Sequence, residues 1–204
     1  LPVRGRPMLD ILLERLEESG VPEIFISVRY LAEKIRDFVA ARKNSAKISL
    51  LLEDEPLGTG GAIGLLPGEF RDHLLVVNGD VVTDVNFREL KAFNDRHGFD
   101  GCLAVTRYQV NVPFGVVDQN RDGSFAGIRE KPDYTHLISA GIYYLSPALR
   151  ALAPRQGPFD MPELLTLGAR AALKIGLFPV HENWRDIGRP ADFHAAQDST
   201  RTEA

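Results

Sequence analysis

The feature of this sequence that most constrains its fold is a regular alternation of helical and extended patterns over the first hundred residues. Leu9, Leu12, Leu13 and Leu16 recur at helical spacing. Pro7 suits the first turn of that helix, and Gly20 suits its end. Further helices are expected near residues 31–39, 59 and 87–93, and strands at 24–28, 48–52, 74–77 and 102–105. This order predicts parallel strands joined by right-handed crossovers.

From about residue 112 the pattern changes to short strands separated by turn residues. Strands are expected at 115–117, 125–128 and 142–145. This change predicts a mixed sheet and a smaller lobe that covers one end of it. Asp160 and Glu163 have the spacing of a capping box for a helix that continues to Ala172. A last strand at 175–180 and a terminal helix from Pro190 to Gln197 complete the expected elements.

These patterns together predict one domain. The chain has 204 residues, of which 44% are hydrophobic, and this is enough for a single α/β domain with a sizeable core. The expected class is α/β: a Rossmann-like open sheet, mixed but mostly parallel, with helices on both faces and a small lobe. The domain is expected to cover residues 1–197, and residues 198–204 form a polar tail.

Composition excludes several classes of function. A net charge of −4 gives no basic surface for nucleic acid. The single cysteine, Cys102, cannot form an intramolecular disulfide, which favours a reducing, cytoplasmic location. No apolar run approaches the roughly 20 residues of a membrane span, and no signal peptide is recognisable. Because the first residue is Leu1 rather than Met, the native start is expected to lie upstream.

Two aspartates are candidates for a metal site. Asp80 ends the turn Asn78-Gly79-Asp80, directly after the apolar strand 74–77. In an open α/β sheet, ligands bind outside the carboxyl ends of the strands. Asp186 has a comparable setting in Trp184-Arg185-Asp186-Ile187-Gly188, and two such carboxylates suit magnesium. The alternatives are a plain turn for Asp80 and a helix-capping acid for Asp186.

Two further segments, one rich in glycine and one charged, are candidates for binding a ligand. In the segment 55–63, glycines let backbone N–H groups approach a nucleotide, although a strand-to-helix turn capped by Thr59 explains the same residues. In Arg129-Glu130-Lys131-Pro132, Lys131 can hold a phosphate and Glu130 can accept hydrogen bonds from sugar hydroxyls. The alternative for this second segment is a solvated charged turn that ends at proline.

Two segments contain small residues where a ligand can approach closely. Gly115, in the segment 112–117, permits close approach to a ring, but a bent edge strand accounts for it nearly as well. The segment Ser139-Ala140-Gly141-Ile142-Tyr143 leaves room beside a ligand. Tight core packing is the alternative for these small residues.

Taken in order, six motifs resemble the sugar-1-phosphate nucleotidyltransferase family, the pyrophosphorylases that make nucleotide sugars. They are Leu57-Gly58-Thr59-Gly60-Gly61, Asn78-Gly79-Asp80, Pro113-Phe114-Gly115-Val116-Val117, Glu130-Lys131-Pro132, Ala140-Gly141-Ile142-Tyr143 and Trp184-Arg185-Asp186-Ile187-Gly188. Each motif is weak by itself, but the combination is specific and covers nearly the whole chain. The sequence looks closest to members that resemble mannose-1-phosphate and heptose-1-phosphate guanylyltransferases.

The resemblance implies a reaction and its residues. An oxygen of a sugar 1-phosphate attacks the α-phosphate of a nucleoside triphosphate in line, and pyrophosphate leaves. The implied catalytic residues are Asp80 and Asp186, which hold Mg²⁺, and Lys131, which contacts the sugar phosphate. The implied nucleotide-binding residues are Gly58, Thr59, Gly60 and Asp80. The implied sugar-phosphate-binding residues are Arg6, Gly115, Glu130, Lys131, Ser139 and Gly141, so the small lobe is expected to bind the sugar.

The sequence also departs from the family pattern. The family's glycine-rich signature loop, which cradles the triphosphate after the first strand, belongs upstream of Leu1 and is absent, so residues 1–204 alone are expected to be catalytically silent. Arg6 replaces a usual lysine, and Ser139 replaces a frequent asparagine. A non-catalytic nucleotide-sugar sensor or regulatory subunit on the same fold therefore stays open. A glycosyltransferase stays open too, as does a homo-oligomer.

Overall fold

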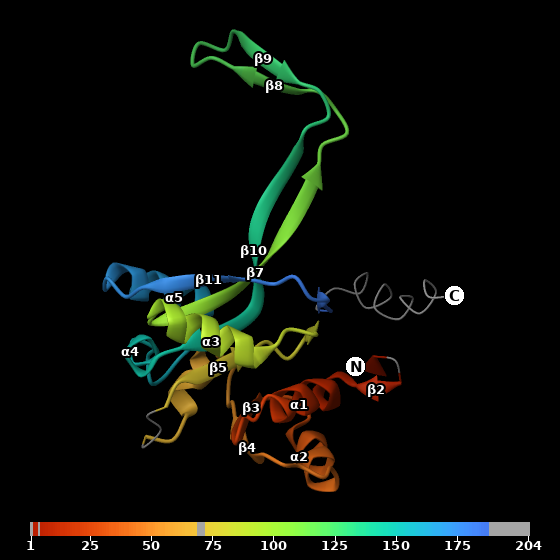
Figure 1. Cartoon of the computed structure of the whole chain (residues 1–204), viewed down its shortest axis with the longest axis vertical. Coiled ribbons are helices and arrows are strands. Elements are labelled where there is room, and N and C mark those ends of the chain that lie inside the picture. The colour runs from red at the N-terminus through yellow and green to blue at the C-terminus, as the bar shows by residue number, and fades with distance from the viewer. Residues whose placement is uncertain (1, 4, 69–71, 188–204) are drawn as a thin grey trace.

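A mixed four-stranded sheet forms the centre of the molecule (Figure 1). The computed structural model describes residues 2–3, 5–68 and 72–187. The sheet has the order β11 (Ile175–Pro179), β7 (Gly101–Asn111), β10 (Asp133–Leu145) and β5 (Leu74–Val77). Strand β10 is antiparallel to both β5 and β7, whereas β7 and β11 are parallel. Three strands therefore run in one direction and β10 alone runs in the other, which agrees with the mixed sheet predicted from the sequence.

The two faces of this sheet bury separate hydrophobic cores. On β7, Cys102 and Ala104 belong to one cluster, and Leu103 packs against the other, as expected when successive side chains of a strand alternate. Helices α1 (Met8–Glu18) and α3 (Phe87–His97) contribute to the first cluster. Helices α4 (Pro147–Arg150) and α5 (Met161–Arg170) contribute to the second. Helices on both faces of the sheet are thus confirmed.

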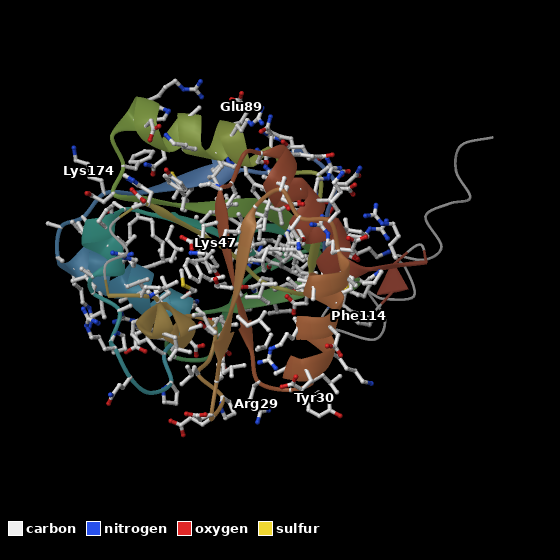
Figure 2. All side chains as sticks on the ribbon, turned by 90° about the horizontal axis from the view of Figure 1, so that it is seen from below. Arg29, Tyr30, Lys47, Glu89, Phe114 and Lys174 are labelled. Carbon is white, nitrogen blue, oxygen red and sulfur yellow. The ribbon has the colours of Figure 1, made fainter. Side chains whose placement is uncertain are left out.

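A second, two-stranded sheet lies beside the first core. It pairs β3 (Glu23–Val28) with β4 (Lys47–Leu52) in parallel, and α2 (Ala32–Ala41) connects the two strands. Side chains of β3 and of β5 pack in the same core cluster, yet no ladder of hydrogen bonds joins these strands within the described part of the chain. After β3 the chain turns at the surface, where Tyr30 points outward and is 80% exposed (Figure 2).

A long ribbon leaves the central sheet and ends in a separate hairpin. Strands β7 and β10 stay paired from the sheet out to Asn111 and Asp133. Beyond them, β8 (Val116–Gln119) and β9 (Phe125–Arg129) form an antiparallel hairpin at the far end (Figure 1). We call residues 106–139 the arm. The sequence predicted a small lobe here, but the strands expected at 102–105 and 142–145 are in fact 11 and 13 residues long.

Several short elements complete the fold. Strands β6 (Val81–Thr83) and β12 (Trp184–Asp186) form an antiparallel pair, as do β1 (Pro2–Val3) and β2 (Arg6–Pro7). A 3₁₀ helix, η1 (Gly61–Leu65), stands where a short helix was predicted. The terminal helix predicted from Pro190 lies outside the described residues. No helix of the described part is long and apolar enough to cross a membrane.

Candidate active site

Asp80 and Asp186 are neighbours although 105 residues separate them in the sequence. The antiparallel pairing of β6 and β12 sets Asp186 opposite Val81, and the Ile187 N–H donates to the Asp80 carbonyl oxygen at 2.9 Å. Both aspartates are exposed at the surface. They lie beyond the carboxyl end of β5, the edge of the sheet at which α/β proteins bind ligands. The structure therefore brings together the two backbone segments that carry the aspartates singled out from the sequence.

The donor set at this pair suits a hard cation. Carboxylate oxygens are the ligands that Mg²⁺ prefers, and Mg²⁺ usually takes one or two protein carboxylates and fills its other positions with water and substrate phosphates. Within the described residues, no group of three or more His, Cys, Asp or Glu side chains is arranged to hold a metal. The pair thus fits a magnesium ion shared with a phosphate better than a metal held entirely by protein.

A bulge in β10 holds the turn that carries Asp80. The pairing of β10 with β7 shifts between Ser139 and Tyr143. Inside this bulge, the Gly141 carbonyl accepts from the Asn78 N–H at 2.8 Å. Gly141 has a φ of +69°, and a side-chain carbon there would lie 2.8 Å from Asn78 Nδ2. The left-handed backbone of Gly141 and the close approach of Asn78 both favour glycine at this position.

Ser139 fixes the same bulge from within. Its hydroxyl accepts from the Gly141 N–H at 3.2 Å and shares a hydrogen bond with the Tyr143 hydroxyl at 3.1 Å. The position predicted to influence sugar choice thus has a local structural role as well. It lies at the base of the arm, close to the Asp80 turn.

The glycine-rich loop is bound to the start of α5. The Thr59 N–H and hydroxyl both contact Asp160 Oδ1, at 2.8 and 3.0 Å, and the Met161 N–H donates to the Thr59 hydroxyl at 3.0 Å. These two bonds from Thr59, backbone and hydroxyl, lower the pKa of Asp160. The predicted capping box of Asp160 with Glu163 is wrong in this respect, since the Asp160 side chain makes no cap bond and Thr59 caps α5 from across the fold.

The same contact explains one of the glycines. Gly58 has a φ of +74°, and a side-chain carbon there would lie 2.6 Å from Asp160 Oδ1. Gly60 is also close, since its N–H donates to the Phe159 carbonyl oxygen at 2.9 Å. Gly58, Thr59 and Gly60 are therefore packed against the start of α5, and a side chain at Gly58 would both clash there and strain the backbone.

Gly115, Glu130 and Lys131 lie together at the elbow between the arm's ribbon and its terminal hairpin. The Lys131 N–H donates to the Phe114 carbonyl oxygen at 3.3 Å, and a side-chain carbon on Gly115 would lie 3.1 Å from Glu130 Oε2. Lys131 has a φ of +44°, which a residue with a side chain rarely adopts and which often marks a functional position.

The elbow is remote from the aspartates along the ribbon. Between Ser139 and Asp133 the strand β10 advances about 20 Å, at ~3.3 Å per residue. The structure thus separates the predicted site into a part at the sheet and a part on the arm. Arg6, on β2 just before α1, bonds through its guanidinium to Asp10 at 2.6 Å and to Glu14 at 2.9 Å, and the bond to Asp10 contributes most to raising its pKa. Met8, two residues further on, shares a small apolar cluster with Ile187 and Val82 beside the aspartates, so the contact of Arg6 with a sugar phosphate stays a prediction.

Sequence reasoning missed two contributors to this arrangement. Asp160 was interpreted as a helix cap, and its bond to Thr59 joins residues 101 positions apart, for which no local pattern exists. Trp184 was noted only as part of a motif. Its indole N–H donates to the Ala140 carbonyl oxygen at 2.7 Å, which connects β12 to the bulge in β10.

Comparison with known proteins gives a consistent result. A family model described as nucleotidyl transferase matches residues 1–203. The mannose-1-phosphate guanylyltransferase catalytic subunit beta of Danio rerio is 32% identical over 201 residues, which are 93% of this chain and 54% of that protein. The chain spans about half the length of the curated relatives it matches.

Solved structures agree with the sequence comparison. The crystal structure of HddC from Yersinia pseudotuberculosis superposes with a TM-score of 0.72 at 27% identity, and the match covers 98% of this chain and 88% of that one. The crystal structure of the same protein complexed with GMP-PN gives a TM-score of 0.69 at 26% identity, with the same coverage.

Proposed function

Because the chain belongs to the nucleotidyl transferase family, we propose that it transfers a nucleotidyl group from a nucleoside triphosphate to a sugar 1-phosphate, with release of pyrophosphate. The observation that carries this proposal is the meeting of Asp80 and Asp186 beyond the carboxyl end of β5. Two carboxylates at that edge are suited to bind the magnesium ion that accompanies a substrate with several phosphates.

In the proposed reaction, an oxygen of the sugar 1-phosphate attacks the α-phosphate in line. Asp80 and Asp186 would hold the Mg²⁺, and a bound magnesium ion neutralises the charge that develops on the phosphates. No covalent intermediate with the protein is needed, so the residues act by orienting the two substrates and by electrostatic stabilisation.

Lys131 and Glu130 are proposed to bind the sugar phosphate and the sugar from the arm. Strands β5 and β7 end at the same edge of the sheet, and the arm projects from that edge (Figure 1). A sugar phosphate attached to a nucleotide at Asp80 would therefore extend to the side on which the arm stands. Gly115 lies beside Glu130 and Ile128, and a side-chain carbon there would lie 2.9 Å from Ile128 Cδ1, so glycine lets the elbow that carries Glu130 and Lys131 pack closely.

We further propose that residues 1–197 form one nucleotidyltransferase-like domain whose central sheet takes one more strand. Strand β3 pairs only with β4, and β5 pairs only with β10, within the described residues. Because their side chains share one core cluster, a strand between them would complete a continuous sheet. That strand is where the family's phosphate-cradling loop would begin, and without it residues 1–204 would bind a triphosphate poorly.

The proposed nucleotide is GTP, and the proposed sugar is of the mannose or heptose type. Supporting this, the relatives include a mannose-1-phosphate guanylyltransferase subunit and a structure complexed with GMP-PN. We propose a cytoplasmic location, because a chain with the single cysteine Cys102 can form no intramolecular disulfide. A homo-oligomer is compatible with this proposal.

The test is a panel of triphosphates and sugar 1-phosphates with the full-length protein, in which pyrophosphate release is measured. GTP with a mannose- or heptose-type phosphate is expected to give the highest kcat/KM. A tenfold preference for UTP or dTTP would contradict the nucleotide assignment. Binding of GTP without any pyrophosphate release would favour a nucleotide-sugar sensor instead.

A further inference from the structure

We propose that Trp184 is a positioning residue that sets the spacing of Asp80 and Asp186 by means of the bulge in β10. This inference rests on the proposed function, because it concerns the metal that these two carboxylates would hold. It assigns a role to the indole N–H, a group that takes no direct part in the proposed chemistry.

The first observation is that two consecutive carbonyls of the bulge bind the two acidic segments. The Ala140 carbonyl oxygen accepts from the Trp184 indole N–H at 2.7 Å. The Gly141 carbonyl oxygen accepts from the Asn78 N–H at 2.8 Å. Trp184 stands two residues before Asp186, and Asn78 stands two residues before Asp80. The same bulge therefore holds each segment at the residue two positions before its aspartate.

The second observation is that the two segments are also joined directly. The Ile187 N–H donates to the Asp80 carbonyl oxygen at 2.9 Å, next to the ladder of β6 and β12. Together with the two bonds to the bulge, this contact closes a circuit of three hydrogen bonds around the aspartates. We call it the carboxylate circuit.

A circuit of this kind matters for magnesium because Mg²⁺ tolerates little error in its ligands. It requires near-octahedral oxygens at about 2.0–2.1 Å, so a shift of a few tenths of an ångström in one carboxylate weakens binding. Asp80 and Asp186 are exposed, Asp80 directly before β6 and Asp186 at the end of β12, and these two strands have only three residues each. The hydrogen bonds of the circuit supply that constraint.

The indole has two separable roles. Its ring packs against the first core cluster and so contributes to stability. Its N–H alone reaches Ala140, and removal of the N–H leaves a half-buried carbonyl without this partner. Trp184→Phe keeps most of the ring burial and removes only the donor, which makes it the informative substitution.

The experiment measures Mn²⁺ binding by electron paramagnetic resonance, since Mn²⁺ accepts the same octahedral oxygen ligands as Mg²⁺. The full-length protein is compared with its variants Trp184→Phe, Asp80→Asn, Asp186→Asn and the control Phe178→Leu. Phe178 packs against the same core cluster but lies on β11, outside the carboxylate circuit. Ser139→Ala loosens the bulge through the hydroxyl bond to Gly141 and serves as a second variant should Trp184→Phe fail to fold.

The expected result is a Kd for Mn²⁺ about tenfold weaker in Trp184→Phe, the size typical of a lost outer contact to a metal site. Ser139→Ala should also weaken binding, whereas Phe178→Leu should lower Tm without changing the Kd. Wild-type affinity in Trp184→Phe, with Mn²⁺ lost in both aspartate variants, would overturn the positioning role and leave the proposed metal site intact. Equal weakening in Phe178→Leu would also overturn it, and unchanged binding in the aspartate variants would remove the metal site itself.

Discussion

Strands β7 and β10 pass through two very different environments, and the contrast separates the molecule into a base and an arm. In the base, both faces of the strands are covered, and Cys102 and Leu145 have no exposed surface. On the arm, Tyr108 is 53% exposed and Leu137 is 60% exposed. The same ladder of hydrogen bonds therefore continues from the packed core of the base into a ribbon that has no core of its own.

This difference shows where stability and mobility are expected to reside. Burial of apolar surface supplies most of the free energy of folding, so the base carries it. A two-stranded ribbon by itself is only marginally stable in water, and regions with few buried contacts open at low free-energy cost. The proposed metal ligands belong to the base, and the proposed sugar-phosphate residues belong to the arm. The site would thus combine a rigid half with an adaptable one.

The largest effect is expected at the metal ligands of the base. Asp80→Asn and Asp186→Asn keep nearly the same size but remove one negative charge each. Activity of the full-length protein should fall by about a hundredfold or more, as for groups that stabilise transition-state charge. Tm should change little, because both side chains are exposed. Pyrophosphate release and a thermal melt of each variant are the two measurements, and full activity in either would remove that aspartate from the site.

A matched pair of leucines on one strand tests the contrast in stability. Leu145→Ala, in the base, should lower the free energy of unfolding by about 2–5 kcal/mol, because it leaves a cavity in a packed core. Leu137→Ala, on the arm, should change it by less than about 0.5 kcal/mol, as most exposed substitutions do. Urea denaturation of both variants gives the comparison. A large loss in Leu137→Ala would mean that the arm is packed against something in solution.

Lys131→Ala tests the arm's proposed share of the site. Loss of a charged hydrogen bond to phosphate costs about 1.5–3 kcal/mol, which corresponds to a change of about ten- to a hundredfold in kcat/KM for the sugar phosphate. The nucleotide KM should stay nearly constant, because the nucleotide binds at the base. Steady-state kinetics with each substrate varied in turn make the measurement.

The matched control for Lys131 is Arg121→Ala. It removes an exposed positive charge from the tip of the same arm, away from the elbow. This variant should behave as wild type. A drop in nucleotide affinity alone after Lys131→Ala would show that the lysine acts on the other substrate.

Sequence patterns predicted the base much better than the arm, and the reason is physical. The base elements alternate or repeat with the period of their secondary structure because one face of each is buried, as in α1 and β3. On the arm, β7 from Thr106 onward and β10 up to Ser139 contact no hydrophobic core. Nothing therefore selects apolar residues at every second position of these stretches. Their pairing was therefore missed, and a small lobe covering one end of the sheet was expected instead.

Sequence patterns singled out candidate residues for the site but not the contacts that connect their segments. Asp80 was found because it follows an apolar strand, and this local signal holds whatever the rest of the chain does. The β6–β12 pairing, the Trp184 bond and the contact of Thr59 with Asp160 each join segments distant in sequence. Short pairs such as β6 and β12 have too few residues to show a period, and only the folded structure reveals them.

The smallest expected effect concerns the contact that holds the glycine-rich loop to α5. Bonds from the Thr59 N–H and hydroxyl lower the pKa of Asp160, so the charged carboxylate is favoured in the folded state. A depressed folded pKa contributes stability above the unfolded value of about 3.9, and this contribution is lost as pH falls below it. Asp160→Asn should therefore lower Tm slightly at pH 7, and the difference from wild type should shrink as the pH falls toward about 3. Thermal melts of both proteins across this range make the measurement, and a gap that persists unchanged at low pH would show that the Thr59 contact does not depend on the charge of Asp160.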